Sequence, residues 1–189
     1  MGRRRDAWLS FVAAFTVVLM AALPDAEASD GELCVPVFAE MTATFFSEGC
    51  TSPVGLCTAG QVTTPTGAIL GVASYTAQGI GGGVVGEASV VTPPVEPSTT
   101  WTYAGELVIS TALGELVMSD VGIFDTAGGA FTEFDRVVSG TGLFTGASGT
   151  LFINGFGFED GSGFYSDIRG TLCVPASHPT SGAVFSMFD

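Results

Sequence analysis

The arrangement of apolar and polar residues along the chain predicts a protein built from β-strands. β-branched and aromatic residues alternate with polar ones, or form short continuous runs, between glycine-rich breaks, and no window of a dozen residues repeats apolar positions with a helical period. Strands are expected at residues 33–47, 67–79, 84–92, 100–111, 114–124, 130–138, 149–158 and 164–174. The short breaks favour antiparallel hairpins, and a meander of this length protects its edges best by closing into a barrel.

Two features stand out between residues 79 and 98. Gly79–Gly86 formally contains the GxGxxG motif of dinucleotide-binding turns, but its valines and the alanine after it have no helical period, so a hairpin tip or bulge is expected instead. Three prolines between residues 91 and 98 exclude a central strand there. We expect this loop to arch over one mouth of the barrel.

The first 28 residues have the pattern of a secretory signal peptide. Arg3–Arg5 form a basic start, residues 7–23 an apolar run, and Ala26–Ala28 place small residues for cleavage. The apolar run lies at the short limit for a membrane span, so we expect none after cleavage. The chain is therefore expected to be exported, to the periplasm or the extracellular medium, with one barrel domain at 29–175. A C-terminal tail at 176–189 is expected to dock on the barrel or on a neighbouring subunit.

The charge balance excludes one class of partner. The chain has 19 acidic and 5 basic residues, no lysine, and a formal net charge of −14, so it has no basic face with which to neutralise nucleic-acid phosphates. The acidic residues are interpreted as a solubilising surface. Because Glu159–Asp160 lacks the spacing of a calcium loop, no metal is expected. No cofactor is expected. The single histidine, His178, lies in the tail, and no G-x-S-x-G motif occurs, which disfavours serine hydrolysis.

Four cysteines remain in the predicted mature chain, an even number that favours disulfides in an exported protein. Cys50 and Cys57 enclose a short turn-rich segment, whereas Cys34 and Cys173 lie in Leu-Cys-Val-Pro sequences at the two ends of the folded region. Four cysteines allow three pairings. We favour Cys50 with Cys57 and Cys34 with Cys173, because the second bond would tie the first strand to the last and close a long loop.

The segment Val137–Leu151, VVSGTGLFTGASGTL, is the most informative part of the chain. Phe144 can anchor a bend in the core, and four glycines permit backbone conformations that residues with a Cβ avoid: Gly140, Gly142, Gly146 and Gly149. The segment resembles the G-G-T-G-x-F-x-x-A-x-G signature of the allene oxide cyclase and dirigent families, most closely bacterial secreted proteins with an allene oxide cyclase barrel-like domain. The resemblance is strong over the last third of the mature chain and extends loosely back to about residue 67.

This resemblance implies an architecture rather than a chemistry. Members of these families are eight-stranded antiparallel, calycin-like β-barrels, often trimeric, with an apolar central cavity, so we expect an all-β barrel of this kind and a homotrimer. Thr145 and Ser148 stand where dirigent proteins usually carry basic residues. No position maps onto the catalytic groups of plant allene oxide cyclases, so no catalytic residue is carried over.

Function then has to come from the barrel interior, where alternate residues of each strand point inward. On residues 101–109 the bulkier set, with Tyr103 and Leu107, fits the packed layer, whereas on 131–138 and 164–173 either set fits. The candidate catalytic residues are Glu106, Glu133, Asp135, Arg136, Tyr103 and Tyr165. The plainer interpretation of Glu133, Asp135 and Arg136 is a charged rim that faces solvent.

Three functions are compatible with these residues. A cofactor-independent cyclase or isomerase would fold a flexible, largely apolar substrate in the cavity and use a few polar groups to handle charge or a proton, since burial raises the pKa of a carboxyl group. A carrier would hold a lipid or a pigment-like ligand. A structural or interaction module would have a filled lumen, for which 15 phenylalanines suffice. A cavity of roughly a few hundred cubic ångströms distinguishes the first two functions from the third.

Overall fold

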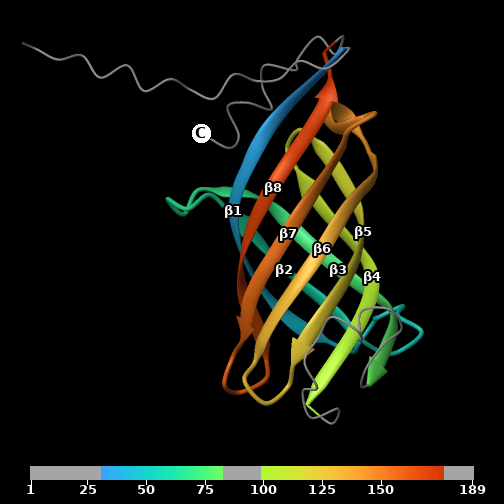
Figure 1. Cartoon of the computed structure of the whole chain (residues 1–189), viewed down its shortest axis with the longest axis vertical. Coiled ribbons are helices and arrows are strands. Elements are labelled where there is room, and N and C mark those ends of the chain that lie inside the picture. Colours follow the sequence, from blue (N-terminus) through green and yellow to red (C-terminus); the bar gives the residue numbers. More distant parts are fainter. Residues whose placement is uncertain (1–30, 83–98, 177–189) are drawn as a thin grey trace, which may run out of the picture.

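The computed structural model describes residues 31–82 and 99–176, which form a closed antiparallel β-barrel (Figure 1). Eight strands follow one another around the barrel in chain order, and the last pairs with the first. The strands are β1 Glu32–Phe46, β2 Cys57–Thr63, β3 Ile69–Gly82, β4 Thr100–Thr111, β5 Gly114–Asp125, β6 Ala130–Gly140, β7 Ser148–Gly157 and β8 Gly163–Pro175. The predicted eight-stranded antiparallel barrel is therefore confirmed. Within the two described ranges, no helix has the length and apolar character needed to cross a membrane.

One strand differs from the sequence prediction. β2 was not expected, because its sequence CTAGQVT has few large apolar residues and a glycine at its centre. Gly60 lies so close to β1 that a Cβ would collide with the backbone of Thr42 and Ala43. This close approach explains why the strand has a glycine at its centre, the feature that argued against a strand in the sequence. The strand predicted at 84–92, the proline loop, the signal segment and the tail lie outside the described residues.

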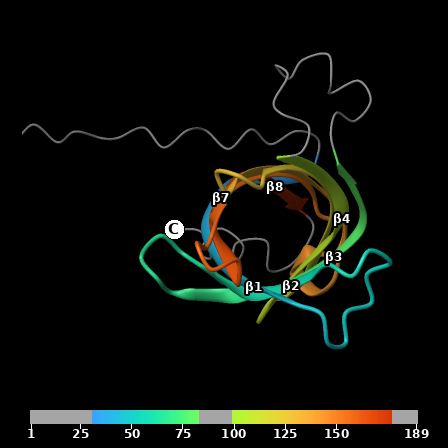
Figure 2. The same ribbon diagram turned by 90° about the horizontal axis from the view of Figure 1, so that it is seen from below.

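Side chains alternate between the inside and the outside of the barrel, as expected for strands of a closed sheet, except at bulges such as the one on β3 between Ala77 and Gly79. On β1, Val35, Val37, Ala39, Met41 and Ala43 are buried, and the residues between them are exposed. The view along the barrel in Figure 2 shows the strands as a ring around one interior. The core therefore consists of inward residues contributed by all eight strands.

One half of the lumen is filled by side chains and is called the packed half below. Its residues come from seven strands and from the turn after β6: Val37, Ala39, Val62, Leu70, Ile109, Leu116, Phe144, Leu151, Ile168 and Leu172. They leave a space of only about 30 Å³ between them. Such a volume is on the order of one water molecule, so this half is packed as densely as an ordinary protein core.

The glycine-rich segment after β6 shapes the packed half. A short 3₁₀ helix, η2 (Gly142–Phe144), follows β6, and Phe144 is only 2% exposed. Gly142 has a φ of 58°, a left-handed conformation that favours glycine, and a Cβ there would collide with the carbonyl oxygen of Leu113. The glycine thus lets the chain turn so that Phe144 enters the barrel.

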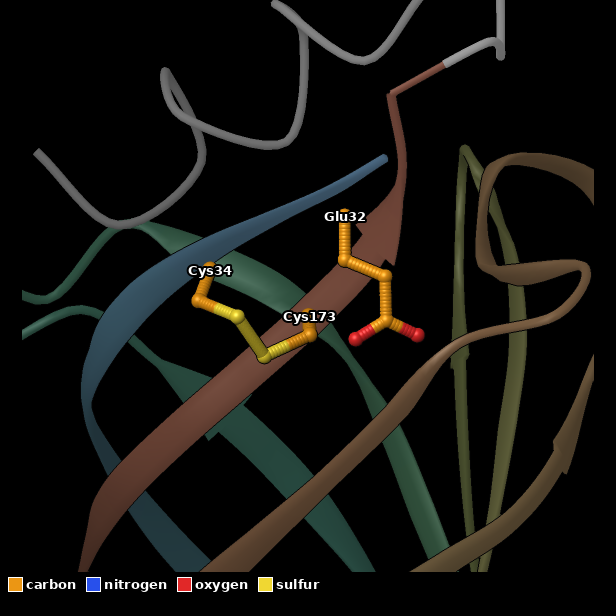
Figure 3. Close-up of side chains that lie close together, drawn as sticks. All are labelled: Glu32, Cys34 and Cys173. Atoms are coloured by element: carbon orange, nitrogen blue, oxygen red, sulfur yellow. A yellow bond between two sulfur atoms is a disulfide. The ribbon is translucent and has the colours of Figure 1, made fainter. Parts of the chain in front are cut away.

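Two disulfides brace the barrel, and their pairing is the one favoured from the sequence. Cys34 on β1 bonds to Cys173 on β8, directly opposite in the register, and the two cysteines are 139 residues apart in the chain. Cys50 and Cys57 close the turn before β2. Figure 3 shows the first bond beside Glu32, across the pair of strands that closes the ring. Formed disulfides are typical of an oxidising compartment.

Candidate functional site

The other half of the lumen is hollow and is called the hollow half below. Its cavity has a volume of about 510 Å³ and opens at the end of the barrel where β4, β6 and β8 begin. Eight aromatic side chains line it: Phe45, Tyr75, Trp101, Tyr103, Phe124, Phe131, Phe158 and Phe164. This size lies in the usual range for small-molecule sites. The lumen is therefore not filled by phenylalanine, and several phenylalanines instead face outward, among them Phe38, Phe134 and Phe152.

A tyrosine and an acid meet on the cavity wall across a glycine. Tyr103 on β4 and Glu133 on β6 both lie opposite Gly122 of the intervening β5, so no side chain stands between them. The Tyr103 hydroxyl donates a hydrogen bond of 2.7 Å to Oε1 of Glu133. A Cβ at position 122 would collide with the Tyr103 ring. Gly122 is thus the residue that allows the pair to form.

A second tyrosine lies near a second acid in the same manner. Tyr75 on β3 passes over Gly105 of β4 toward Asp120 of β5, which is the register partner of Gly105. A Cβ at position 105 would lie 2.6 Å from the Tyr75 hydroxyl oxygen. Tyr75 is only 8% exposed and contacts Tyr103 edge to face at 6.2 Å between ring centroids. The two tyrosines therefore form one wall of the cavity, with a carboxyl group behind each.

Two aspartates lie beneath this wall, at the boundary between the two halves. Asp120 and Asp135 are register partners on β5 and β6, and they are 1% and 0% exposed. None of their four carboxyl oxygens makes a hydrogen bond of ordinary geometry, although the Tyr75 hydroxyl and the Gly105 amide are near enough to affect Asp120. A buried carboxylate without partners is costly, so such groups take up a proton instead.

Burial raises the pKa of all three interior acids. Desolvation raises the pKa of Asp135 to about 9, with further contributions from Glu133 and Asp120. It raises the pKa of Glu133 to about 8, against the lowering effect of the Tyr103 hydrogen bond. For Asp120 the pKa rises to about 6, because Gly105 and Tyr75 offset part of the desolvation. At neutral pH, Glu133 and Asp135 are therefore mainly neutral acids and Asp120 is mainly a carboxylate.

In the described part of the chain, the lining of the cavity contains acidic side chains but no basic one. None of the residues that line the cavity is an arginine, lysine or histidine. Arg136 and Arg169 lie on the outer face, where their guanidinium groups stand 5.9 Å from the ring centroids of Phe134 and Phe38. Desolvation and the neighbouring Glu133 also raise the pKa of Tyr103, so its hydroxyl keeps its proton. The electrostatic environment of the cavity is thus negative.

The described residues contain one group of three potential metal ligands, and it lies away from the cavity. It consists of Glu32, Cys34 and Cys173, whose donor atoms lie within 4.8 Å of one another (Figure 3). Both sulfur atoms are consumed by the disulfide between these cysteines. Because zinc and similar ions bind cysteine as the free thiolate, this group does not have the donors of a metal site.

The predicted site residues divide into two groups. Tyr103, Glu133 and Asp135 point into the lumen, and the pattern on β6 places Phe131 and Val137 on the same side. The structure places the other three on the outer face, exposed and away from the cavity: Glu106, Arg136 and Tyr165.

Sequence reasoning missed Asp120 and Tyr75. Asp120 lies between Ser119 and Val121 in the sequence. Because one neighbour is polar and the other apolar, the local pattern does not indicate which face of the strand points into the barrel. The usable signal was the pair of glycines in the middle of apolar strands, at positions 105 and 122, since such glycines mark a close approach of another group.

Comparison with known proteins found similarity among solved structures alone. No family model matches the chain, and no curated protein matches it. Among solved structures, a pterocarpan synthase dirigent protein is similar, with 13% sequence identity and a TM-score of 0.43 over 78% of this chain and 88% of that one. The barrel described above rests on the strand register of this chain. The closer kinship with allene oxide cyclases that Val137–Leu151 implies stays a prediction.

Proposed function

We propose that this protein binds a small, largely apolar molecule in the hollow half and, without a cofactor, cyclises or isomerises it. The observation that carries the proposal is the Tyr103–Glu133 pair on the wall of an aromatic cavity of about 510 Å³. Aromatic walls can hold a flexible molecule near its reactive conformation, and this positioning by itself lowers the barrier to ring closure. The protein is proposed to act after export, as the predicted signal segment and the disulfides support.

Glu133 is the proposed proton-transfer group. Its Oε1 accepts the Tyr103 hydrogen bond, so the proton of the neutral acid sits on Oε2 and can be donated to the substrate. A pKa of about 8 lies close to neutral pH, where a general acid is most effective. Loss of a proton from the rearranged molecule back to Glu133 restores the acid, so that the net reaction is an isomerisation. Tyr103 acts as a positioning residue for Glu133.

The test begins with the molecule that the protein retains. Native mass spectrometry of protein purified from its source identifies a bound compound, and a neutral, environment-sensitive dye such as Nile red reports on the cavity. Trp101 lines the cavity, and the other tryptophan, Trp8, lies in the predicted signal segment, so Trp101 fluorescence reports binding directly. If neither a retained compound nor dye binding is found, the proposal is wrong.

Matched variants separate catalysis from binding. Glu133→Gln should abolish turnover of the retained compound while Trp101 fluorescence still reports its binding, because the amide keeps the shape of the acid but donates no acidic proton. Glu106→Gln removes a carboxyl group from the outer face of the barrel and should leave turnover unchanged. A retained compound that binds wild-type protein without any chemical change supports the alternative function of a carrier, for which the same cavity is suited.

The outer face supports a second proposal, that copies of the chain associate into the homotrimer expected from the family resemblance. A row of register partners crosses five strands there: Arg169 stands between Phe38 and Phe152, and Phe152, Phe134 and Val121 follow one another, with these four apolar residues exposed by 37% to 56%. Contiguous exposed apolar side chains mark interaction surfaces. Light scattering on the wild type and on Phe152→Ser tests this proposal: a trimer that the substitution dissociates supports it, and a wild-type monomer contradicts it.

A further inference from the structure

The cavity combines two features that bear on the charge of its ligand. Eight aromatic rings line it, and its ionisable side chains are all acids or phenols. Glu133 lies on the wall, Glu159 lies at the mouth, and Asp120 and Asp135 lie behind the wall. Tyr75 also lines the cavity with its ring, in a side chain 8% exposed, while its buried hydroxyl is directed toward Asp120.

We propose that the ligand of this cavity is a lipophilic organic cation: an amine or quaternary ammonium group on an apolar body, held with its charge between Glu133 and the faces of the surrounding rings. This inference rests on the proposed function only in taking the cavity as the ligand site. It adds the charge of the ligand, which the proposed function leaves unspecified.

The aromatic lining is suited to a cation because the face of each ring carries partial negative charge. Tyr75, Tyr103 and Trp101 each contribute a ring to the cavity wall. Phe131 and Phe164, which also line the cavity, meet edge to face at 5.0 Å between ring centroids. A cation within about 6 Å of such ring centroids is attracted to the ring faces, and the attraction is stronger when water is excluded.

The same groups discriminate against anions. An anion such as a fatty-acid carboxylate would enter a cavity that offers no arginine, lysine or histidine as a counter-ion. It would also be repelled by the Asp120 carboxylate behind the Tyr75 ring, in a poorly solvated interior where charge repulsion is weakly screened. Neutral ligands gain the apolar contacts but not the charge contacts, so they should rank between cations and anions.

Binding of a cation should release a proton. The Glu133 carboxyl is mainly neutral at pH 7, since its pKa is about 8, and a cation beside it favours the ionised form. The neutral acid therefore loses a proton to solvent, and a carboxylate paired with the cation remains. With such a cation as substrate, Glu133 begins the isomerisation as the proton acceptor and then returns the proton to the rearranged molecule, in place of acting first as the donor. Four titratable groups lie near Glu133: Tyr75 on β3, Tyr103 on β4, Asp120 on β5 and Asp135 on β6. The residues of β1, β7 and β8 that line the cavity carry no ionisable group.

Four probes with one apolar body test the proposal. They are 1-naphthylmethylamine, its N,N,N-trimethylammonium analogue, 1-naphthylmethanol and 1-naphthoate, titrated calorimetrically into wild-type protein at pH 8 and pH 5. Both cations should bind about tenfold or more tightly than the alcohol at pH 8, since about 1.4 kcal/mol corresponds to a factor of ten, and naphthoate should bind most weakly. At pH 5 the preference for cations should shrink because the interior acids are protonated. Buffers of different ionisation enthalpy should reveal proton release with both cations.

A matched pair of variants sharpens the test. Glu133→Gln should lose the preference for cations and the proton release but keep the affinity for 1-naphthylmethanol, whereas Glu106→Gln should behave as the wild type. If the alcohol binds wild-type protein as tightly as the cations, the inference is wrong, although the cavity remains a ligand site. If none of the four probes binds, the proposed function fails as well.

Discussion

The two halves of the lumen are made by the same eight strands, yet they differ in almost every respect. The packed half holds aliphatic side chains and Phe144 with about 30 Å³ left between them. The hollow half holds aromatic side chains, inward glycines and acids around about 510 Å³. Closing a sheet into a barrel fixes which residues face inward but does not fix whether they fill the space. The inward side chains alone therefore decide which half stabilises the fold and which half is free to bind.

The aspartate pair lies where these two halves meet. Asp120 and Asp135 are fully buried, as core residues are, but they carry the chemistry of the cavity. A barrel evolved for stability alone would gain by replacing them with apolar residues of similar size. Their presence at this boundary indicates that the packed half supports a polar floor beneath the binding space, at a cost in stability that the packed half has to offset.

The largest difference between the halves should appear when an aromatic side chain is removed from each. Phe144→Ala leaves a void in a packed region and should lower the free energy of unfolding by about 3–5 kcal/mol. Trp101→Ala removes a side chain that is 44% exposed at the cavity, and should cost less than about 1 kcal/mol while weakening binding of a cavity ligand. Denaturant unfolding of both variants checks this. Equal losses of stability would mean that the hollow half contributes as much to the fold as the packed half.

The next effect comes from filling a space that the hollow half keeps empty. Gly122→Ala should displace the Tyr103 ring and break its bond to Glu133, with a loss of stability of about 1–3 kcal/mol from overpacking. Gly79 offers the matched control, because a Cβ there meets no atom within 4 Å and its φ is not left-handed. Gly79→Ala should leave binding in the cavity unchanged, whereas Gly122→Ala should alter it. Indistinguishable binding by the two variants would contradict the role assigned to Gly122.

A third effect concerns pH. The folded chain holds protons on Asp120, Glu133 and Asp135 up to about pH 6, 8 and 9, whereas the unfolded chain releases them near pH 4. The folded state thus binds more protons in this interval, so the contribution of these groups is fully present below about pH 4 and is lost as the pH rises through their folded pKa values. Thermal unfolding should show stability falling from pH 5 to pH 9.

Substitution of one aspartate tests the origin of this trend. Asp135→Asn removes one titrating group and should make the decline shallower by up to about 1.4 kcal/mol per pH unit. Glu106→Gln removes an acid from the outer face and should keep the wild-type slope, which controls for the change in net charge. An Asp135→Asn slope equal to that of the wild type would show that Asp135 does not hold a proton in the folded state.

The smallest effect should come from the tyrosine hydroxyl. Tyr103→Phe keeps the ring but removes the hydrogen bond to Glu133, a loss of about 0.5–1.5 kcal/mol. Because that bond lowers the pKa of Glu133, its removal should raise this pKa further. Carbon-detected NMR of the Glu133 carboxyl measures the shift. A lowered pKa would contradict the arrangement of the pair.

The barrel could be predicted from the sequence because strand alternation and glycine turns act locally. The inner face of β6 could not, since it inverts the usual rule: Glu133 and Asp135 point inward, whereas Phe134 and Arg136 face outward. Either set of side chains fits the strand alone, and only the pairing with β5 and β7 decides between them. Asp120 was missed for the same reason. The acids most important to the cavity were thus the ones whose orientation depends on the closed ring.

The bond between Cys34 and Cys173 has a consequence for the chain as a whole. It joins the two ends of the barrel sequence, so the residues from 34 to 173 form a covalent ring. A single proteolytic nick anywhere within that ring leaves one molecule, and fragments separate only after reduction. For the same reason, new termini introduced by circular permutation in the connection between β3 and β4 would leave strands β1 and β8 tethered to each other.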